Sequence, residues 1–191
     1  MHNPVQKTMQ DAVLGAALNV WSQAKEQHYI PITGRSMFPL LREGDQVLVT
    51  HGCPGIRRGD VIVFRLRGTL IAHRVLSILE RDTVPIFVTK GDNVSHFDPH
   101  LSSSEIVGRV LAVKRGNRCM PLDTAIWRIL GWFLAVSTLS FAKIHGCGRN
   151  FKPRRFGTYC ARLTPVVHAC KQALAFFIRN MVFAVFCKWK S

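Results

Sequence analysis

The pattern of apolar and polar positions divides the chain into three parts. In residues 1–27, apolar side chains from Met9 to Trp21 recur at helical spacing along one face, whereas Gln10 and Lys25 lie on other faces. This spacing predicts an amphipathic helix. The segment is too polar to cross a bilayer, which takes about 20 mainly apolar residues, and it lacks the basic start and the cleavage site of a signal peptide.

The second part, residues 28–116, is built from short runs that are rich in Val, Ile and Phe. Turn residues such as Glu43-Gly44-Asp45 and Arg67-Gly68 separate these runs. Short strands at this spacing predict an all-β sheet or a coiled barrel. The expected strands are residues 28–33, 46–50, 60–66, 69–79, 84–89 and 105–114.

The third part, residues 117–191, contains two strongly apolar runs, 126–142 and 173–187, each interrupted by one arginine. A basic, polar segment separates them, so the pattern predicts a helical hairpin. Both runs are short for a membrane span. Apolar faces among basic side chains are typical of helices that lie on anionic lipid, and this predicts membrane attachment through the tail. An ordinary packed helical hairpin is the alternative.

The charge is distributed as unevenly as the hydrophobicity. Residues 114–191 hold 14 of the 26 lysines and arginines but only one of the 11 acidic residues, so the front of the chain is nearly neutral. This asymmetry indicates two regions with different partners. Basic charge alone does not separate phosphate from lipid, but the long apolar runs between the charges favour lipid over nucleic acid.

The six cysteines are scattered and form no Cys-x-x-Cys pair. A zinc site needs paired ligands at short spacing, and this pattern does not supply them. We therefore expect no metal and no cofactor.

The stretch TGRSMFPLLREGDQVLV, residues 33–49, carries the first candidate chemistry. Ser36 stands at the entrance to a tight turn, and a serine nucleophile needs a base for its proton and donors for the oxyanion that follows. His73 is the best candidate base, although a lone histidine in a strand is more often structural. Asp92 and Asp98, in a loop further on, are carboxylates that could orient an imidazole, although both also suit turn formation.

Four blocks of the sequence, taken in order, resemble type I signal peptidases, specifically the serine–histidine branch of the endoplasmic reticulum and of archaea. The resemblance covers residues 30–113, and the chain would be a short, stand-alone member. The blocks are GRSMFPLLREGDQVLV, RRGDVIVFR…IAHRVLSI, FVTKGDNVSHFDP and EIVGRVLAV.

This resemblance implies a coiled, partly open β-sheet peptidase domain in residues 28–116, preceded by the amphipathic helix and followed by the helical tail. It implies a serine endopeptidase that cleaves a leader or signal peptide from a peptide or preprotein substrate. Ser36 matches the nucleophile, His73 the general base and Asp98 the acid that orients the base.

Three further positions match the family's pattern in supporting roles. Asp92 matches a second acidic position, and Met37 and Pro39 match the residues that shape the turn. Gly34 is a departure, because the position two before the nucleophile is commonly a serine whose hydroxyl helps to hold the oxyanion. Loss of one such donor costs about 10²–10³ in rate.

A second departure concerns the anchor. The family is usually held by an N-terminal transmembrane helix, whereas this chain has the amphipathic segment 8–24. Attachment through residues 117–191 would make the protein membrane-associated and would allow the catalytic domain to face the cytosol.

Two other functions remain open. A self-cleaving repressor-type serine peptidase would need a lysine base, and Lys90 is the only lysine in residues 28–113. A non-catalytic peptide-binding module of the same fold is the second alternative, and the intact set of Ser36, His73 and Asp98 speaks against it.

Overall fold

The computed structural model describes residues 27–52 and 55–150, without the side chains of Phe141 and of residues 143–150. The predicted N-terminal helix and the second apolar run, 173–187, lie outside the described residues. The elements, in chain order, are β1 (Gln27–Pro31), β2 (Gln46–His51), β3 (Val61–Leu66), β4 (Thr69–Arg81), β5 (Val84–Lys90), β6 (Leu101–Ser102), the 3₁₀ turn η1 (Ser103–Glu105), β7 (Ile106–Arg115), β8 (Arg118–Pro121) and the helix α2 (Ala125–Asn150).

The strands form one antiparallel sheet in the order β1-β2-β7-β3-β4-β5-β6, and β8 pairs with the end of β7. The prediction of a mainly β fold is confirmed, and the expected strands begin and end within two residues of the observed ones. The long strand β4 pairs with β3 through its first half and with β5 through its second half. Residues near the middle of β4 therefore lie where the two pairings meet.

The core consists of two clusters of buried side chains. One includes Val47 and Val49 of β2, which alternate with more exposed residues as expected for a strand with one buried face. The other surrounds Ile62 and Phe64 of β3 together with Phe87 of β5. The first cluster also takes in side chains from the turn after β1, so the core fixes the position of that turn.

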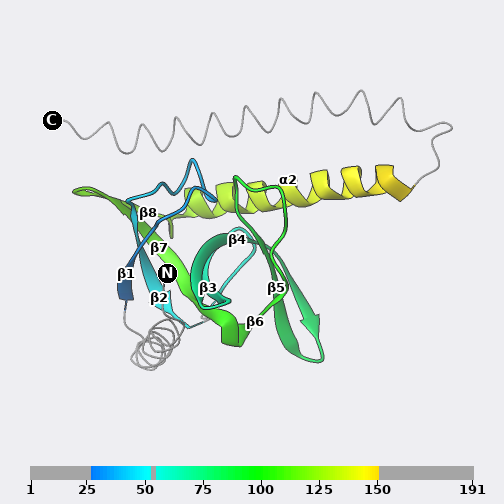
Figure 1. Ribbon diagram of the computed structural model, residues 1–191, viewed down its shortest axis with the longest axis horizontal. Coiled ribbons are helices and arrows are strands. Elements are labelled where there is room, and N and C mark those ends of the chain that lie inside the picture. Colours follow the sequence, from blue (N-terminus) through cyan, green and yellow to red (C-terminus); the bar gives the residue numbers. More distant parts are fainter. Residues whose placement is uncertain (1–26, 53–54, 151–191) are drawn as a thin grey trace, which may run out of the picture.

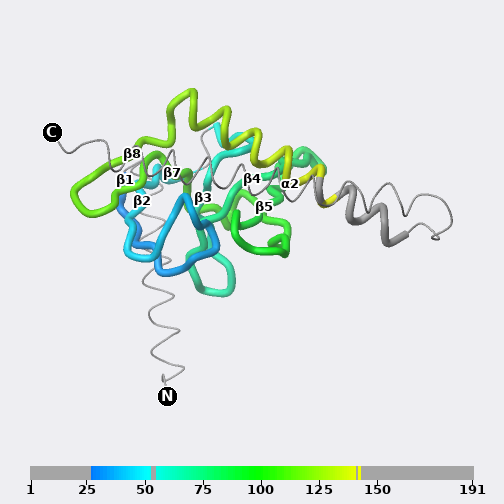
Figure 2. The backbone as a smooth tube through the Cα atoms, turned by 90° about the horizontal axis from the view of Figure 1, so that it is seen from above, coloured from blue at the N-terminus to red at the C-terminus, as the bar shows by residue number. Residues whose placement is uncertain are grey.

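Helix α2 runs along one side of the sheet and packs against β4 (Figures 1 and 2). Trp127, Leu130 and Leu134 lie against the first core cluster. The expected helical run 126–142 thus corresponds to α2, whose first turns pack on the β domain. Within residues 27–52 and 55–150, no helix is long and apolar enough to cross a membrane.

The sheet extends past residue 116, where the sequence pattern places the end of the β domain. Gly116 takes a positive φ of 58° in the turn between β7 and β8. Strand β8 then brings Met120 into the core, where it is fully buried. The start of the tail is therefore part of the packed domain, because its apolar side chains complete the first core cluster.

Candidate active site

Ser36 lies in the turn that follows β1. The turn is closed by backbone hydrogen bonds from Phe38 to Arg35 at 3.1 Å and from Leu41 to Met37 at 3.0 Å, and the Phe38–Pro39 peptide bond is cis. Met37 is 2 % exposed and inserts into the first core cluster. The turn is therefore held by Met37 in the core, while Ser36 stays partly exposed and lines a groove.

His73 and Asp98 are hydrogen-bonded to each other. Nδ1 of His73 lies 2.7 Å from Oδ2 of Asp98, and both side chains are only 6 % exposed. The hydroxyl of Thr89 donates to the same carboxylate oxygen at 2.8 Å, and the backbone N–H of Asp98 donates to the carbonyl of Thr89. This arrangement holds the imidazole by its Nδ1 and leaves Nε2 for another partner.

Gly91 lies between His73 and the turn that carries Ser36. A Cβ added to Gly91 would lie 2.8 Å from Nε2 of His73 and 2.7 Å from the backbone oxygen of Ser36. Nε2 and the Ser36 backbone oxygen therefore both lie close to Gly91, at a position where a larger residue would not fit. The backbone N–H of Asn93 donates to the Ser36 carbonyl at 2.7 Å, which ties the loop to the turn.

The three predicted residues Ser36, His73 and Asp98 thus meet at one place, although they come from a turn, from β4 and from the loop after β5. Within the described part of the chain, the Ser36 hydroxyl makes no hydrogen bond with the His73 ring. Catalytic hydrogen bonds are often long without substrate and tighten when substrate binds. The serine, histidine and aspartate therefore lie near one another, and the catalytic role of the three residues stays a prediction.

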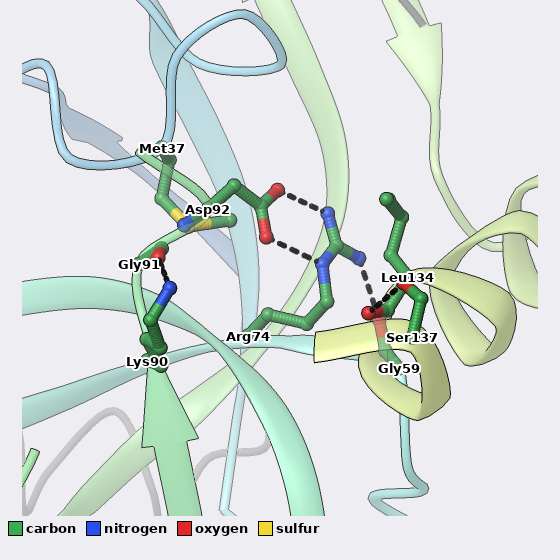
Figure 3. A network of polar contacts seen from close by, with 8 residues as sticks. All are labelled: Met37, Gly59, Arg74, Lys90, Gly91, Asp92, Leu134 and Ser137. Carbon is green, nitrogen blue, oxygen red and sulfur yellow. Dashed lines mark hydrogen bonds and ion pairs between the residues drawn. The ribbon is translucent and has the colours of Figure 1, made fainter. Parts of the chain in front are cut away.

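Asp92 does not face His73 and instead pairs with Arg74. Its two carboxylate oxygens accept from Nε and Nη2 of Arg74 at 2.8 and 2.6 Å (Figure 3). The backbone N–H of Asp92 contacts the sulfur of Met37 at 3.4 Å. These contacts agree with a supporting role and join the loop to the nucleophile's turn.

Arg74 is the residue of the site that the sequence did not single out. Its side chain is 5 % exposed, and Nη1 donates to the carbonyl of Gly59 at 2.7 Å. The available signal was an arginine within a mainly aliphatic strand, because such a strand is usually buried and a buried charge must be paired. The partner could not be read from the sequence, because Asp92 lies in a loop beyond the next strand.

Lys90, the candidate lysine base, points away from this constellation. It is the cross-strand partner of Arg74, so both side chains leave the same face of the sheet, whereas the adjacent His73 leaves the opposite face. Nζ of Lys90 donates to the carbonyl of Gly91 at 3.2 Å (Figure 3). A direct proton transfer from Ser36 to this amine is therefore disfavoured.

A groove of about 320 Å³ opens beside Ser36 and His73. Its walls are mainly apolar, and they include Ile30, Ile32, Leu70 and Ala72. Residues 69–73 pair with β3 on one edge, while pairing with β5 begins at Arg74, so within the described residues their second edge has no strand partner. An extended peptide can add to such an edge through backbone hydrogen bonds.

Gly34 also lines the groove, two residues before Ser36. A Cβ built on Gly34 would meet no atom within 4 Å. The structure therefore has room for a serine side chain at this position, although the sequence has glycine.

Comparison with known proteins identified one family model, described as Peptidase S24-like, that matches residues 4–111. The match covers more than half of the chain and includes Ser36, His73 and Asp98. No curated protein matches. The match supports the prediction of a serine peptidase domain. It does not point specifically to a signal peptidase.

Proposed function

Because the chain belongs to the Peptidase S24-like family, which implies serine hydrolase activity on peptides, we propose that Ser36, His73 and Asp98 carry that activity. The observation that supports this most directly is the His73–Asp98 hydrogen bond of 2.7 Å at a groove that Ser36 and His73 both line. A histidine held in this way is oriented to accept a proton from a serine hydroxyl.

In the proposed reaction the Ser36 oxygen attacks the carbonyl carbon of the scissile peptide bond while Nε2 of His73 takes its proton. Asp98 keeps the proton of the ring on Nδ1 and stabilises the imidazolium that forms. The backbone N–H of Ser36 is the proposed donor to the developing oxyanion. His73 then protonates the leaving amine, and the resulting ester is hydrolysed by a water that His73 activates in the same way.

The substrate is proposed to lie extended in the groove, along the open edge of residues 69–73. Apolar walls favour apolar substrate side chains near the cleaved bond. Together with the four ordered blocks, this supports cleavage of a leader or signal peptide from a preprotein, in a domain of the coiled signal-peptidase type.

The test is to incubate membranes with the active protein and with Ser36→Ala, and to map the new N-termini of the products. Cleavage that depends on both Ser36 and His73 is expected. If instead Lys90→Ala abolished cleavage and His73→Ala retained it, the base would be lysine and the mechanism that of the self-cleaving serine–lysine peptidases.

We also propose that residues 117–191 attach the protein to anionic lipid. The side of α2 away from the core exposes Ile126, Ile129, Trp132 and Phe133, each by half or more. Two exposed arginines, at positions 57 and 58, precede the turn at Gly59 that touches α2. An apolar helix face beside basic side chains suits the interface of a negatively charged membrane.

Co-sedimentation distinguishes this from nucleic-acid binding. The full chain should bind anionic vesicles more strongly than duplex DNA, and binding should persist in part at high salt because the apolar contribution is not screened. Binding to DNA alone, lost at high salt, would refute the lipid proposal.

A further inference from the structure

Helix α2 meets the sheet at a contact between two glycines. A Cβ added to Gly131 would lie 2.5 Å from the carbonyl oxygen of Gly59 and 3.1 Å from Nη1 of Arg74. A Cβ added to Gly59 would overlap the backbone of Gly131 and Trp132. The helix can therefore approach the turn before β3 this closely only with glycine on both sides.

Arg74 lies beside this contact and links it to the active-site loop. Its Nη1 donates to the Gly59 carbonyl at 2.7 Å, and its Nε and Nη2 hold Asp92 (Figure 3). A guanidinium donates in a rigid, planar fork. Because all three nitrogens are engaged, the position of Gly59 determines where Arg74 can hold Asp92.

Asp92 belongs to the segment that contacts the nucleophile's turn. The next residue, Asn93, donates its backbone N–H to the Ser36 carbonyl and its side-chain amide to the Arg35 carbonyl, at 2.7 and 3.2 Å. Contacts therefore run without interruption from α2 through Gly59, Arg74 and Asp92 to the turn that carries Ser36.

We propose that α2 positions the active site: Gly131, seated on Gly59, holds Arg74 and through it the Asp92–Asn93 segment and the Ser36 turn. The proposal rests on the proposed function, in which Ser36 is the nucleophile. Gly59, Gly131 and Arg74 are positioning residues, since no described residue of α2 lines the groove. The helix thereby contributes to catalysis without touching the substrate.

The test compares Gly131→Ala with Ser140→Ala, an exposed position on the same helix, in the full chain. Alanine is a better helix former than glycine, so the helix itself is not weakened, but the new Cβ must push α2 off Gly59. Amide hydrogen exchange at Asn93 should become about tenfold faster or more, because its partner turn loosens. Exchange at Val49, in β2, should stay unchanged.

Cleavage kinetics provide the second readout. Gly131→Ala should lower kcat about tenfold or more through misplacement of Ser36, while KM changes little because α2 is absent from the groove. Ser140→Ala should match the wild type in both. A folded Gly131→Ala protein with wild-type kcat would overturn the proposal.

Hydrogen exchange decides the outcome even without a substrate. If Asn93 exchange in Gly131→Ala equals that of the wild type, or if Val49 accelerates equally, the helix does not position the loop and the proposal fails. A wild-type protein with no Ser36-dependent cleavage would refute the proposed function instead, and the exchange result would still decide the contact between α2 and the loop.

Arg74→Lys serves if Gly131→Ala does not fold. Lysine keeps the charge but has a single nitrogen, so it cannot reproduce the planar fork that holds both Asp92 oxygens and the Gly59 carbonyl. Faster exchange is expected both at Asn93 and in α2 around Leu134, since coupling is reciprocal. Faster exchange at Asn93 alone, with α2 protected as before, would overturn the coupling.

Discussion

Gly91 is the position where a single methyl group has the largest expected effect on the site. The Cβ of Gly91→Ala would meet both Nε2 of His73 and the Ser36 backbone oxygen, so the base and the nucleophile must separate. A misplacement of catalytic groups by about 1 Å costs about 10²-fold in rate. Steady-state cleavage kinetics should show that loss in kcat, and Ser95→Ala, an exposed position in the same loop, should retain activity. Wild-type kcat in Gly91→Ala would mean that His73 does not serve Ser36.

The two aspartates of the loop should respond differently to the same change. Asp98→Asn keeps the shape of the side chain but can present its N–H to Nδ1 of His73, which favours the wrong tautomer, and kcat should fall by about 10³–10⁴. Asp92→Asn weakens the bond to Arg74, so the fall in kcat should be smaller and accompanied by a lower Tm. Kinetics and thermal unfolding measured together check both, and an equal loss of kcat at unchanged Tm would contradict these assignments.

Position 34 is where we expect a substitution to raise the activity. The groove has room for a side chain there, and a serine hydroxyl two residues before Ser36 would add a donor to the oxyanion. Gly34→Ser is expected to raise kcat about tenfold, below the full 10²–10³ of an optimised donor. Gly34→Ala, which adds the carbon but no donor, should give no such gain, and an equal gain from both would exclude oxyanion stabilisation as the cause.

The carboxylate of Asp60, in the turn before β3, is partly buried, and this burial disfavours its ionised form. Burial raises the pKa of Asp60, an effect only partly offset by a hydrogen bond from the Arg57 backbone and by Arg109 and Arg128. The folded state therefore holds this proton more tightly than the unfolded chain, whose aspartate pKa is about 3.9. The contribution of Asp60 to the free energy of unfolding consequently falls as pH rises through the folded pKa.

Asp60→Asn removes this penalty and can still accept the Arg57 hydrogen bond. Its Tm should equal or exceed that of the wild type at neutral pH, and the difference should disappear toward pH ~3, where both side chains are neutral. Thermal unfolding across this pH range is the measurement. A Tm loss confined to neutral pH would show that the arginines stabilise the carboxylate more than burial destabilises it.

On the scale of the whole molecule, residues 117–150 complete the fold as well as extend it. Met120 is fully buried, and Trp127, Leu130 and Leu134 pack on the same cluster. Each large apolar side chain contributes about 1.5–3 kcal/mol when fully buried, against a typical total stability of about 5–15 kcal/mol. The boundary of the folded unit therefore lies beyond residue 116.

A chain ending at residue 150 should unfold cooperatively in denaturant, whereas a chain ending at residue 116 should be strongly destabilised or aggregate. Chemical denaturation of the two truncations measures the difference. Equal stability of both would show that β8 and α2 are dispensable for the fold and that the sequence-based boundary is the better one.

The sequence by itself determined six of the eight strands in the described residues, missing β6 and β8, and the identity of the candidate site residues. Alternating apolar positions such as Val47 and Val49 define strands because the side-chain period of a strand is two residues. Ser36, His73 and Asp98 were found because their local blocks, in order along the chain, resemble those of a known family. Both kinds of signal are local in the sequence, so they can be recognised without knowledge of the fold.

Only the tertiary structure decided how these residues meet. Pairing of β4 with β5 at Arg74 sets His73 and Lys90 on opposite faces, which favours histidine over lysine as the base. The Arg74–Asp92 bond and the contact of Gly59 with Gly131 join segments that are distant along the chain. No local pattern encodes such contacts, because their geometry depends on strand register and on the approach of a helix to a turn.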